Sequence, residues 1–207
     1  MSALRVGLTF DAEHPDRPAI AGTTEALVAR LAERGVRATF FVQGRWAEAY
    51  PEVVTRIVSA GHLVGSHSHY HARMPLLTDA GIAADLADAA AAIVAAAGVS
   101  PMPWFRCPFG AGASDERVLA GLRAAGYRHV GWHVAADDWD PAHDATIVTN
   151  AIVDGVRAHG DGSVVLLHTW QSATLGSLDP ILTRLADAGA AFCRVDELAD
   201  IPSGVPE

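Results

Sequence analysis

RVGLTF at residues 5–10 and ATFFV at residues 38–42 are two short apolar runs, separated by a segment in which apolar residues have helical spacing. Within that segment Thr23 or Thr24 is suited to begin a helix and Gly35 to end it. Threonine caps exposed helix N–H groups, and glycine tolerates the left-handed backbone that often follows a helix. Strand, helix and strand in this order predict two parallel strands joined by a right-handed crossover. This unit decides the fold class, which is α/β.

The same alternation continues along the chain. Further strands are predicted at 62–66, 104–107, 129–134, 163–168 and 191–195, and further helices begin near Pro51, Thr78 and Ser114 or cover 144–159 and 178–188. No glycine-rich turn of the GxGxxG or GxxxxGKS type follows any of these strands, so a nucleotide-binding sheet is unsupported. Seven strands that alternate with helices predict a small, irregular β/α barrel. We expect one domain over 1–207, with a loose tail at 201–207.

The composition describes a well-packed globular chain of 207 residues, half of them apolar and 19% charged. Acids outnumber bases 24 to 15, and a net charge of −9 disfavours nucleic acid or an anionic membrane as partner. The apolar stretch 80–97 is interrupted by Gly81, Asp85 and Asp88, so no membrane span is expected. MSALRVGLTF lacks the features of a secretory leader, and the two cysteines form no CxxC motif. We expect a cytoplasmic protein, although a secreted chain trimmed of its leader would look the same.

Reactive side chains cluster where the predicted strands end. In a β/α barrel the carboxyl ends of all strands open onto one face, where the connecting loops form the active site. The sequence therefore predicts a site on that face, built from several distant segments. The clusters are Asp11 and Glu13, His67 to His71, Arg106 to Gly110, Asp137 to Trp139, and His168.

The stretch GSHSHYH at 65–71 contains three histidines. If the chain forms a helical turn after the strand, the i, i+4 spacing places His67 and His71 on one side and His69 elsewhere. Two imidazoles and one carboxylate leave coordination positions open for water and substrate, as catalytic metals require. The competing interpretation is a polar turn. His14 and His133 lie near the predicted site but have no spacing partner.

Asp11 and Glu13 are the nearest carboxylates on the same face. One of them can hold a metal while the other removes a proton from water, a division of labour that we expect to require a turn between them. The alternative is that DAEHPD is a solvated loop.

The remaining clusters contain residue types suited to hydrolysis. Arg106 can hold a catalytic carboxylate ionised and oriented. Pro108 and Gly110 predict a tight turn whose backbone N–H groups can face a developing oxyanion. Asp138 can orient His168, which would then serve as a general acid.

The order of these pieces resembles the NodB-homology polysaccharide deacetylases, carbohydrate esterase family 4. The resemblance covers nearly the whole chain, and it implies a distorted (β/α)7 barrel and metal-dependent removal of N-acetyl or O-acetyl groups from sugars. The matching segments are LTFDAE, ATFFVQG, HSHYH, RCPFG, DDW, VVLLH and GAAFCRVDEL.

The resemblance also implies roles for individual residues. It makes Asp11 the base paired with Arg106, and it makes His168 the acid paired with Asp138. The Phe109 N–H is implied as the oxyanion donor. The metal, zinc before cobalt, nickel or manganese, is implied to bind His67 and His71, with Ser68 bracing the loop. Substrate contacts are implied for Trp139, Leu166 and Pro108.

The chain departs from the family pattern at three positions. Ala12 occupies the usual place of the metal-binding aspartate and cannot bind a metal. Glu13 fits a D-x-E form that resembles some members, which would make it the third ligand. Ala135 replaces the first aspartate of D-x-x-D-W, and Thr169 replaces the aspartate that often follows the last histidine.

Three functions remain open at this point. The first is a hydrolase of C–N bonds other than peptide bonds that removes acetyl groups from a sugar or polysaccharide. The second is a hydrolase of a small linear or cyclic amide, such as allantoin or an imide. The third is a metal-free relative that binds carbohydrate without catalysis, as the loss of the acid at Ala12 would allow.

Overall fold

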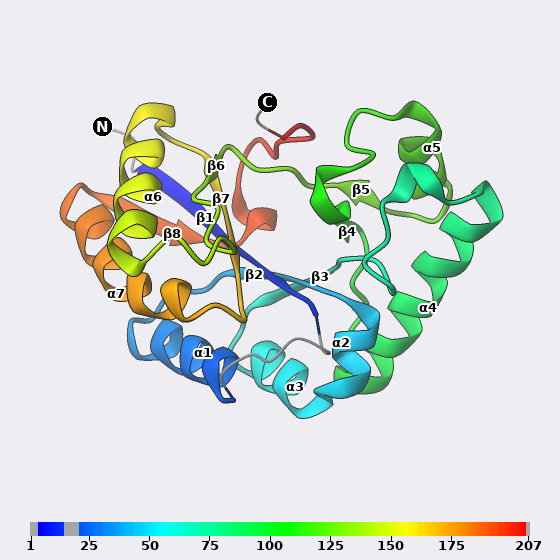
Figure 1. The fold of residues 1–207 in the computed structure, drawn as a ribbon, viewed down its shortest axis with the longest axis horizontal. Helices are drawn as coiled ribbons and strands as arrows, with labels where there is room; N and C mark the ends of the chain where they lie inside the picture. Colours follow the sequence, from blue (N-terminus) through cyan, green and yellow to red (C-terminus); the bar gives the residue numbers. More distant parts are fainter. Residues whose placement is uncertain (1–3, 15–20, 206–207) are drawn as a thin grey trace.

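The computed structural model describes residues 4–14 and 21–205 (Figure 1). Within them a parallel sheet has the strand order β5-β4-β3-β2-β1-β7-β6, and β8 pairs with β1. The strands are β1 (Leu4–Ala12), β2 (Thr39–Val42), β3 (Leu63–Ser66), β4 (Trp104–Phe105), β5 (Arg128–His129), β6 (Val134–Ala135), β7 (Ser163–His168) and β8 (Ala190–Cys193). The helices are α1 (Thr23–Glu33), α2 (Gly44–Ala49), α3 (Pro51–Ser59), α4 (Asp79–Ala97), α5 (Glu116–Ala124), α6 (Ala145–His159) and α7 (Ser172–Asp187). Three short 3-10 turns are η1 (Met74–Leu76), η2 (Pro108–Gly110) and η3 (Val195–Glu197).

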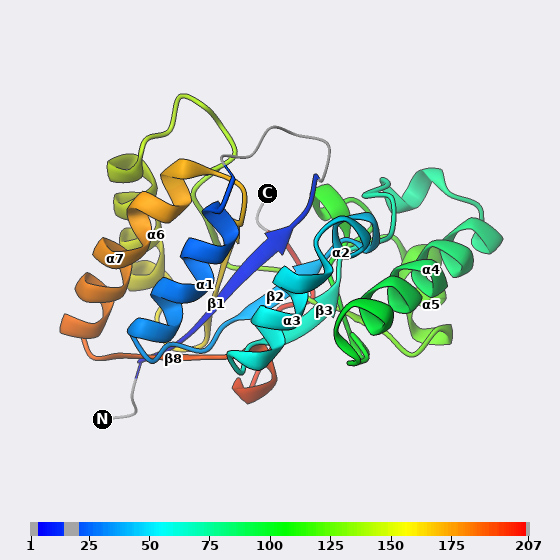
Figure 2. The same cartoon turned by 90° about the horizontal axis from the view of Figure 1, so that it is seen from below.

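Strand β1 holds the sheet together because it has three partners. One of its edges pairs with β7, while the other pairs first with β8 and then with β2. The sheet curls around β1, and α6, α7, α1, α3 and α4 cover its outer side (Figures 1 and 2). The predicted distorted β/α barrel is confirmed.

The two faces of β1 have different environments, as the two-residue period of a strand requires. The even-numbered Val6, Leu8, Phe10 and Ala12 are fully buried in the main hydrophobic core. The odd-numbered Thr9 and Asp11 instead contact a buried arginine described below. One strand therefore contributes both to the core and to the polar interior.

The segment predicted as one strand at 129–134 is divided into β5 and β6. Residues 130–133 cross the gap between the two ends of the sheet. The backbone N–H groups of the middle two residues bond to the C-terminal tail rather than to a strand. Gly131 N donates to Pro202 O at 2.7 Å, and Trp132 N donates to Gly204 O at 3.3 Å. A side chain at Gly131 would lie 1.6 Å from the Gly204 oxygen, so only glycine fits. Part of the tail that we expected to be loose thus fills this gap.

Two helices differ from prediction. Helix α2, which precedes the predicted helix at Pro51, was not predicted. Helix α7 begins at Ser172 rather than near residue 178 and continues through Pro180.

Helix α4 is long and apolar enough to meet the length and composition criteria for a membrane span. Core helices of globular proteins meet the same criteria. Here α4 packs against α2, α3 and α5, and its Asp85 is buried and hydrogen-bonded to a loop of the site.

Candidate active site

A groove of about 1100 Å³ opens at the carboxyl ends of the strands. Side chains from β1, β6, β7 and the loops after β3 and β4 converge on it, so the structure brings the five predicted clusters together. We call it the strand-end groove. Its lining includes Asp11, Glu13, His67, His71, Phe109, Asp137, Trp139, Leu166 and His168.

Glu13, His67 and His71 meet in this groove. Their ligand atoms all lie within 4.8 Å of one another. His67 Nε2 lies 3.2 Å from Glu13 Oε2, and His71 Nε2 contacts the same oxygen. His67 Nδ1 donates to the Arg106 carbonyl at 3.0 Å, which leaves Nε2 facing the carboxylate. Because two imidazoles and a carboxylate are a donor set of catalytic zinc sites, these residues fit a divalent metal.

The turn that we expected between Asp11 and Glu13 is absent. Strand β1 continues to Ala12, and Glu13 follows directly. The alternation of the strand places both carboxylates in the groove, while Ala12 between them is fully buried in the core. The expectation of a turn was wrong because one intervening residue already returns the chain to the same face.

Burial and charge act in opposite directions on these groups. Burial raises the pKa of Glu13, but hydrogen bonds with His14, His67 and His71 outweigh burial and hold this pKa far below its usual range. Burial lowers the pKa of His67, but the Asp11 and Glu13 carboxylates outweigh it and raise this pKa. Glu13 is therefore ionised, which is the form that binds a cation.

The loop of the two histidines is not the helical turn that we expected. Its residues have no helical assignment, and Ser68 and His71 have φ values of 64° and 57°. The carboxylate of Asp85 on α4 accepts from the N–H groups of His69 and Tyr70 at 3.0 and 3.2 Å. Helix α4 thus fixes the loop between the two imidazoles, which share a side for this reason.

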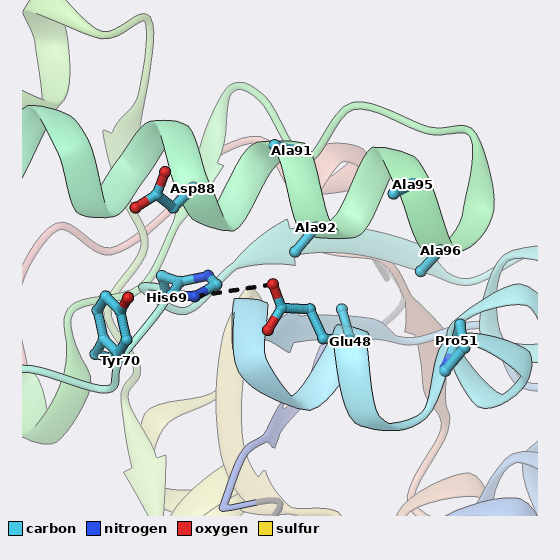
Figure 3. A pocket seen from close by; sticks show the side chains of 10 residues that line it. Glu48, Pro51, His69, Tyr70, Asp88, Ala91, Ala92, Ala95 and Ala96 are labelled. Carbon is cyan, nitrogen blue, oxygen red and sulfur yellow. Dashed lines mark ion pairs between the residues drawn. The ribbon is translucent and has the colours of Figure 1, made fainter.

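His69 faces a different cavity. This outer pocket of about 630 Å³ lies between α4 and the α2–α3 segment, as Figure 3 shows. His69 Nε2 points towards Glu48, whose Oε1 is 4.0 Å away. A side chain at Gly44 would lie 2.3 Å from His69 Nδ1, so the ring occupies the space that this glycine leaves. The structure separates His69 from the other two histidines, in agreement with the sequence prediction.

Asp11 is held by Arg106, which is fully buried. One terminal nitrogen of Arg106 donates to Asp11 Oδ1 at 2.9 Å and to Thr9 Oγ1 at 2.8 Å. The other donors reach the carbonyl oxygens of Val130 and Gly131. Every part of the guanidinium is thus engaged, and Asp11 Oδ2 is left facing His67 Nε2 at 3.5 Å.

His168 and Asp138 form the second charged pair. His168 Nδ1 donates to Asp138 Oδ1 at 2.7 Å, and the backbone N–H of His168 donates to Oδ2 at 2.8 Å. Burial lowers the pKa of His168, but the Asp138 carboxylate outweighs it and raises this pKa to about 9. The imidazole is therefore protonated at neutral pH, and its Nε2 lies 4.0 Å from Glu13 Oε1.

Aromatic side chains form the rim of the groove. Phe109 and Trp139 are about half exposed, and Leu166 lines the wall below them. Phe109 has φ 59° within η2, and its ring lies 4.5 Å from that of His71. Pro108 is buried beside Phe109 and does not line the groove. Its position therefore does not support the direct substrate contact that the resemblance implied.

Two partners of the site were not predicted. His14 Nε2 lies 2.9 Å from Glu13 Oε1, and the Thr174 hydroxyl on α7 donates to Asp138. His14 has a signal in the sequence, which is its position directly after Glu13. Thr174 has none, because its contact depends on how α7 packs.

Comparison with known proteins agrees with this geometry. The family model described as polysaccharide deacetylase matches residues 2–130. The chain is 32% identical over 194 residues to the peptidoglycan-N-acetylglucosamine deacetylase PgdA of Listeria monocytogenes, an alignment that covers 94% of this chain and 38% of PgdA. The chain thus spans well under half of that relative.

Two solved structures share the fold closely. A family 4 acetyl xylan esterase from Clostridium thermocellum, in complex with a cobalt ion, has a TM-score of 0.78 at 28% identity and covers 97% of this chain and 94% of its own. A family 4 pseudoenzyme from Bacillus anthracis has a TM-score of 0.83 at 26% identity and covers 96% and 66%. With motifs, fold and family model in agreement, the resemblance seen in the sequence is confirmed, and the chain belongs to the polysaccharide deacetylase family, carbohydrate esterase family 4.

Proposed function

We propose that the chain is a metal-dependent hydrolase that removes acetyl groups from an N-acetylated or O-acetylated sugar polymer. The observation that carries the proposal is that Asp11, Glu13, His67, His71 and His168 line one groove, where buried partners hold two of them and three sets of groups result. They are the donor set Glu13, His67 and His71, the pair Asp11 and Arg106, and the pair His168 and Asp138. The names of the relatives, a peptidoglycan deacetylase and an acetyl xylan esterase, support the substrate class.

Glu13, His67 and His71 would hold the metal. Zinc is the first choice, with cobalt, nickel or manganese as alternatives, and the ion would polarise the acetyl carbonyl and acidify water. The carboxylate and the two imidazole Nε2 atoms are the only groups that this role requires of the chain.

Asp11 and His168 then divide the proton transfers of amide hydrolysis. Asp11 takes a proton from the attacking water as the new C–O bond forms, and Arg106 holds this carboxylate in orientation by a hydrogen bond. His168 gives its Nε2 proton to the departing nitrogen as the C–N bond breaks, and Asp138 holds the imidazolium that makes this proton available.

The remaining groups stabilise and enclose the reacting acyl group. The Phe109 N–H would donate to the carbonyl oxygen as it gains negative charge. Leu166 and Trp139 would enclose the acetyl methyl, since both line the groove beside His168.

The test is acetate release from N-acetylglucosamine oligomers by chelator-treated protein with and without added zinc or cobalt. Metal-dependent release supports the proposal. Consumption of allantoin or a cyclic imide, with no acetate released, would replace the polymer with a small amide as substrate. Binding of the oligomers without hydrolysis, by protein that retains no metal, would indicate a non-catalytic relative instead.

A further inference from the structure

The two oxygens of the Glu13 carboxylate have separate partners. Oε2 contacts His67 and His71, as described above. Oε1 instead lies 2.9 Å from Nε2 of His14, and the His14 side chain is about one-fifth exposed. Because the ionised carboxylate can only accept, His14 Nε2 must carry the proton and donate it. That nitrogen is consequently not a metal ligand, and His14 contacts the Glu13 oxygen that His67 and His71 do not contact.

A glutamate needs such a partner more than an aspartate does. Its side chain has one more rotatable bond, so fixing it in a single geometry costs more conformational entropy. A hydrogen bond to the oxygen that does not face the ligand pair restricts this freedom. Partners of this kind typically change metal affinity by about 10-fold to 100-fold.

His14 is itself held in place by the segment that follows β2. Its backbone has φ 58°, and its N–H donates to the side chain of Gln43 at 3.0 Å. Gln43 is almost fully buried, and its own N–H donates to Ala12 O at 3.0 Å. The His14 ring also packs edge-on against His71 and Trp170. These contacts fix the imidazole from several directions.

The next residue of the same segment reaches the histidine loop. Gly44 N donates to Ser68 O at 2.9 Å. Residues 43 and 44 therefore bond to both chain segments that carry the ligand set, one ending in Glu13 and the other connecting His67 to His71. This junction helps to fix the distance between the two segments, together with the pairing of the neighbouring Val42 with Ala12 and Ser66 in the sheet.

We propose that His14 is a positioning residue that orients Glu13 as a metal ligand, and that Gln43 anchors His14 for this purpose. The inference rests on the proposed metal site and adds to it the means by which a glutamate one place beyond the usual aspartate position is held.

The test measures metal binding rather than turnover. Chelator-stripped protein is titrated with Co²⁺, followed by its visible absorption, and with Zn²⁺ in competition with a chromogenic chelator. We expect His14→Ala to weaken binding about 10-fold to 100-fold without changing the shape of the cobalt spectrum, because the three ligands remain. His14→Gln keeps an N–H donor near the position of Nε2 and should recover part of the affinity. His159→Ala is the matched control, since it removes an imidazole from the same groove without touching Glu13.

Binding by His14→Ala within twofold of wild type overturns the positioning role. A cobalt spectrum that changes shape means that His14 is itself a ligand and also overturns it. Wild-type protein that binds neither metal overturns the proposed function together with this inference. If circular dichroism shows that His14→Ala does not fold, Gln43→Leu provides the test. It removes the anchor of His14 but no imidazole, and it should weaken metal binding several-fold.

Discussion

The two ends of strand β3 carry histidines with opposite surroundings. His62 lies just before the strand, and its Nδ1 accepts the N–H of Ala38 at 3.0 Å. His67 lies just after the strand and faces the Asp11 and Glu13 carboxylates. Burial lowers the pKa of His62 to about 4, whereas the two carboxylates raise that of His67 despite its burial.

His129 and His168 repeat the contrast elsewhere in the molecule. His129 accepts the N–H of Cys107 at 3.3 Å, and burial lowers its pKa to about 4. His168 donates to Asp138, and its pKa is about 9. The partner decides the role of the imidazole. A histidine that accepts a backbone N–H is a neutral part of the scaffold, and one that faces a carboxylate at a strand end is available for chemistry.

The largest effect is expected at Asp11. Asp11→Asn removes the charge that takes the proton of water but keeps the shape and the contact with Arg106, so turnover should fall by about 100-fold or more. Acetate release is the measurement, with circular dichroism to verify folding. Asp88→Asn, in the outer pocket of Figure 3, is the matched control and should retain wild-type turnover. Near wild-type activity of Asp11→Asn would remove Asp11 from the role of base.

A similar loss is expected at the acid. His168→Ala leaves the departing nitrogen without a proton donor, which should lower turnover about 100-fold while the fold persists. An ester substrate should lose less than an amide, because an alkoxide leaves more readily than an amide anion. Equal losses on amide and ester would contradict the assignment of His168 as the acid.

Replacing the partner of His168 should change the pH profile more than the maximal rate. In the proposed mechanism the protonated form of His168 is the active one, so activity should fall as the pH rises through its pKa. Asp138→Asn removes the carboxylate that raises this pKa, and the alkaline fall should therefore begin at lower pH than in wild type. Profiles of kcat/KM against pH for both proteins check this. An unchanged alkaline limb would show that another group sets it.

Replacing His62, just before β3, should change stability but not catalysis. His62→Ala leaves the Ala38 N–H unpaired, which costs about 1–3 kcal/mol of unfolding free energy by denaturant titration. The His62 pKa is about 4 in the folded protein and near 6.5 when unfolded, so acid favours the unfolded chain. The wild-type unfolding free energy should fall as the pH drops from 6.5 to 4, and less steeply in the variant. A loss of metal affinity in His62→Ala would break the contrast between the two ends.

Much of the fold follows from local sequence. The runs at 5–10 and 163–168 lie within β1 and β7, and the run at 38–42 contains β2. Continuous apolar residues suit strands that are covered on both faces. The prediction of one strand at 129–134 was wrong because apolar character does not reveal tertiary hydrogen bonds. Gly131 bonds to the C-terminal tail, and Arg106 donates to the carbonyl oxygens of residues 130 and 131. Helix α2 has six residues and begins at Gly44, which gives neither a periodic pattern nor a capping signal.

The site could be located from the sequence but its supports could not. Motif order predicted that Asp11, Glu13, His67, His71 and His168 line one groove, although the predicted Pro108 does not line it. The loop of His67 and His71 was expected to be helical, because sequence spacing alone does not show that Asp85 holds it from α4. Thr174 and Gln43 act through tertiary contacts with no periodicity, so they appear only once the chain is folded.

The buried methyl group of Ala12 has a consequence for engineering towards the family consensus. Consensus substitutions usually stabilise a protein, and here the consensus residue would be aspartate. Its side chain would enter the hydrophobic interior that contains Phe10, Ala12 and Val42. Such a substitution would cost stability of several kcal/mol and still leave the acid on the wrong side of the strand. If Glu13 is the third ligand, as proposed, restoring aspartate at this position would therefore destabilise the protein without adding a ligand.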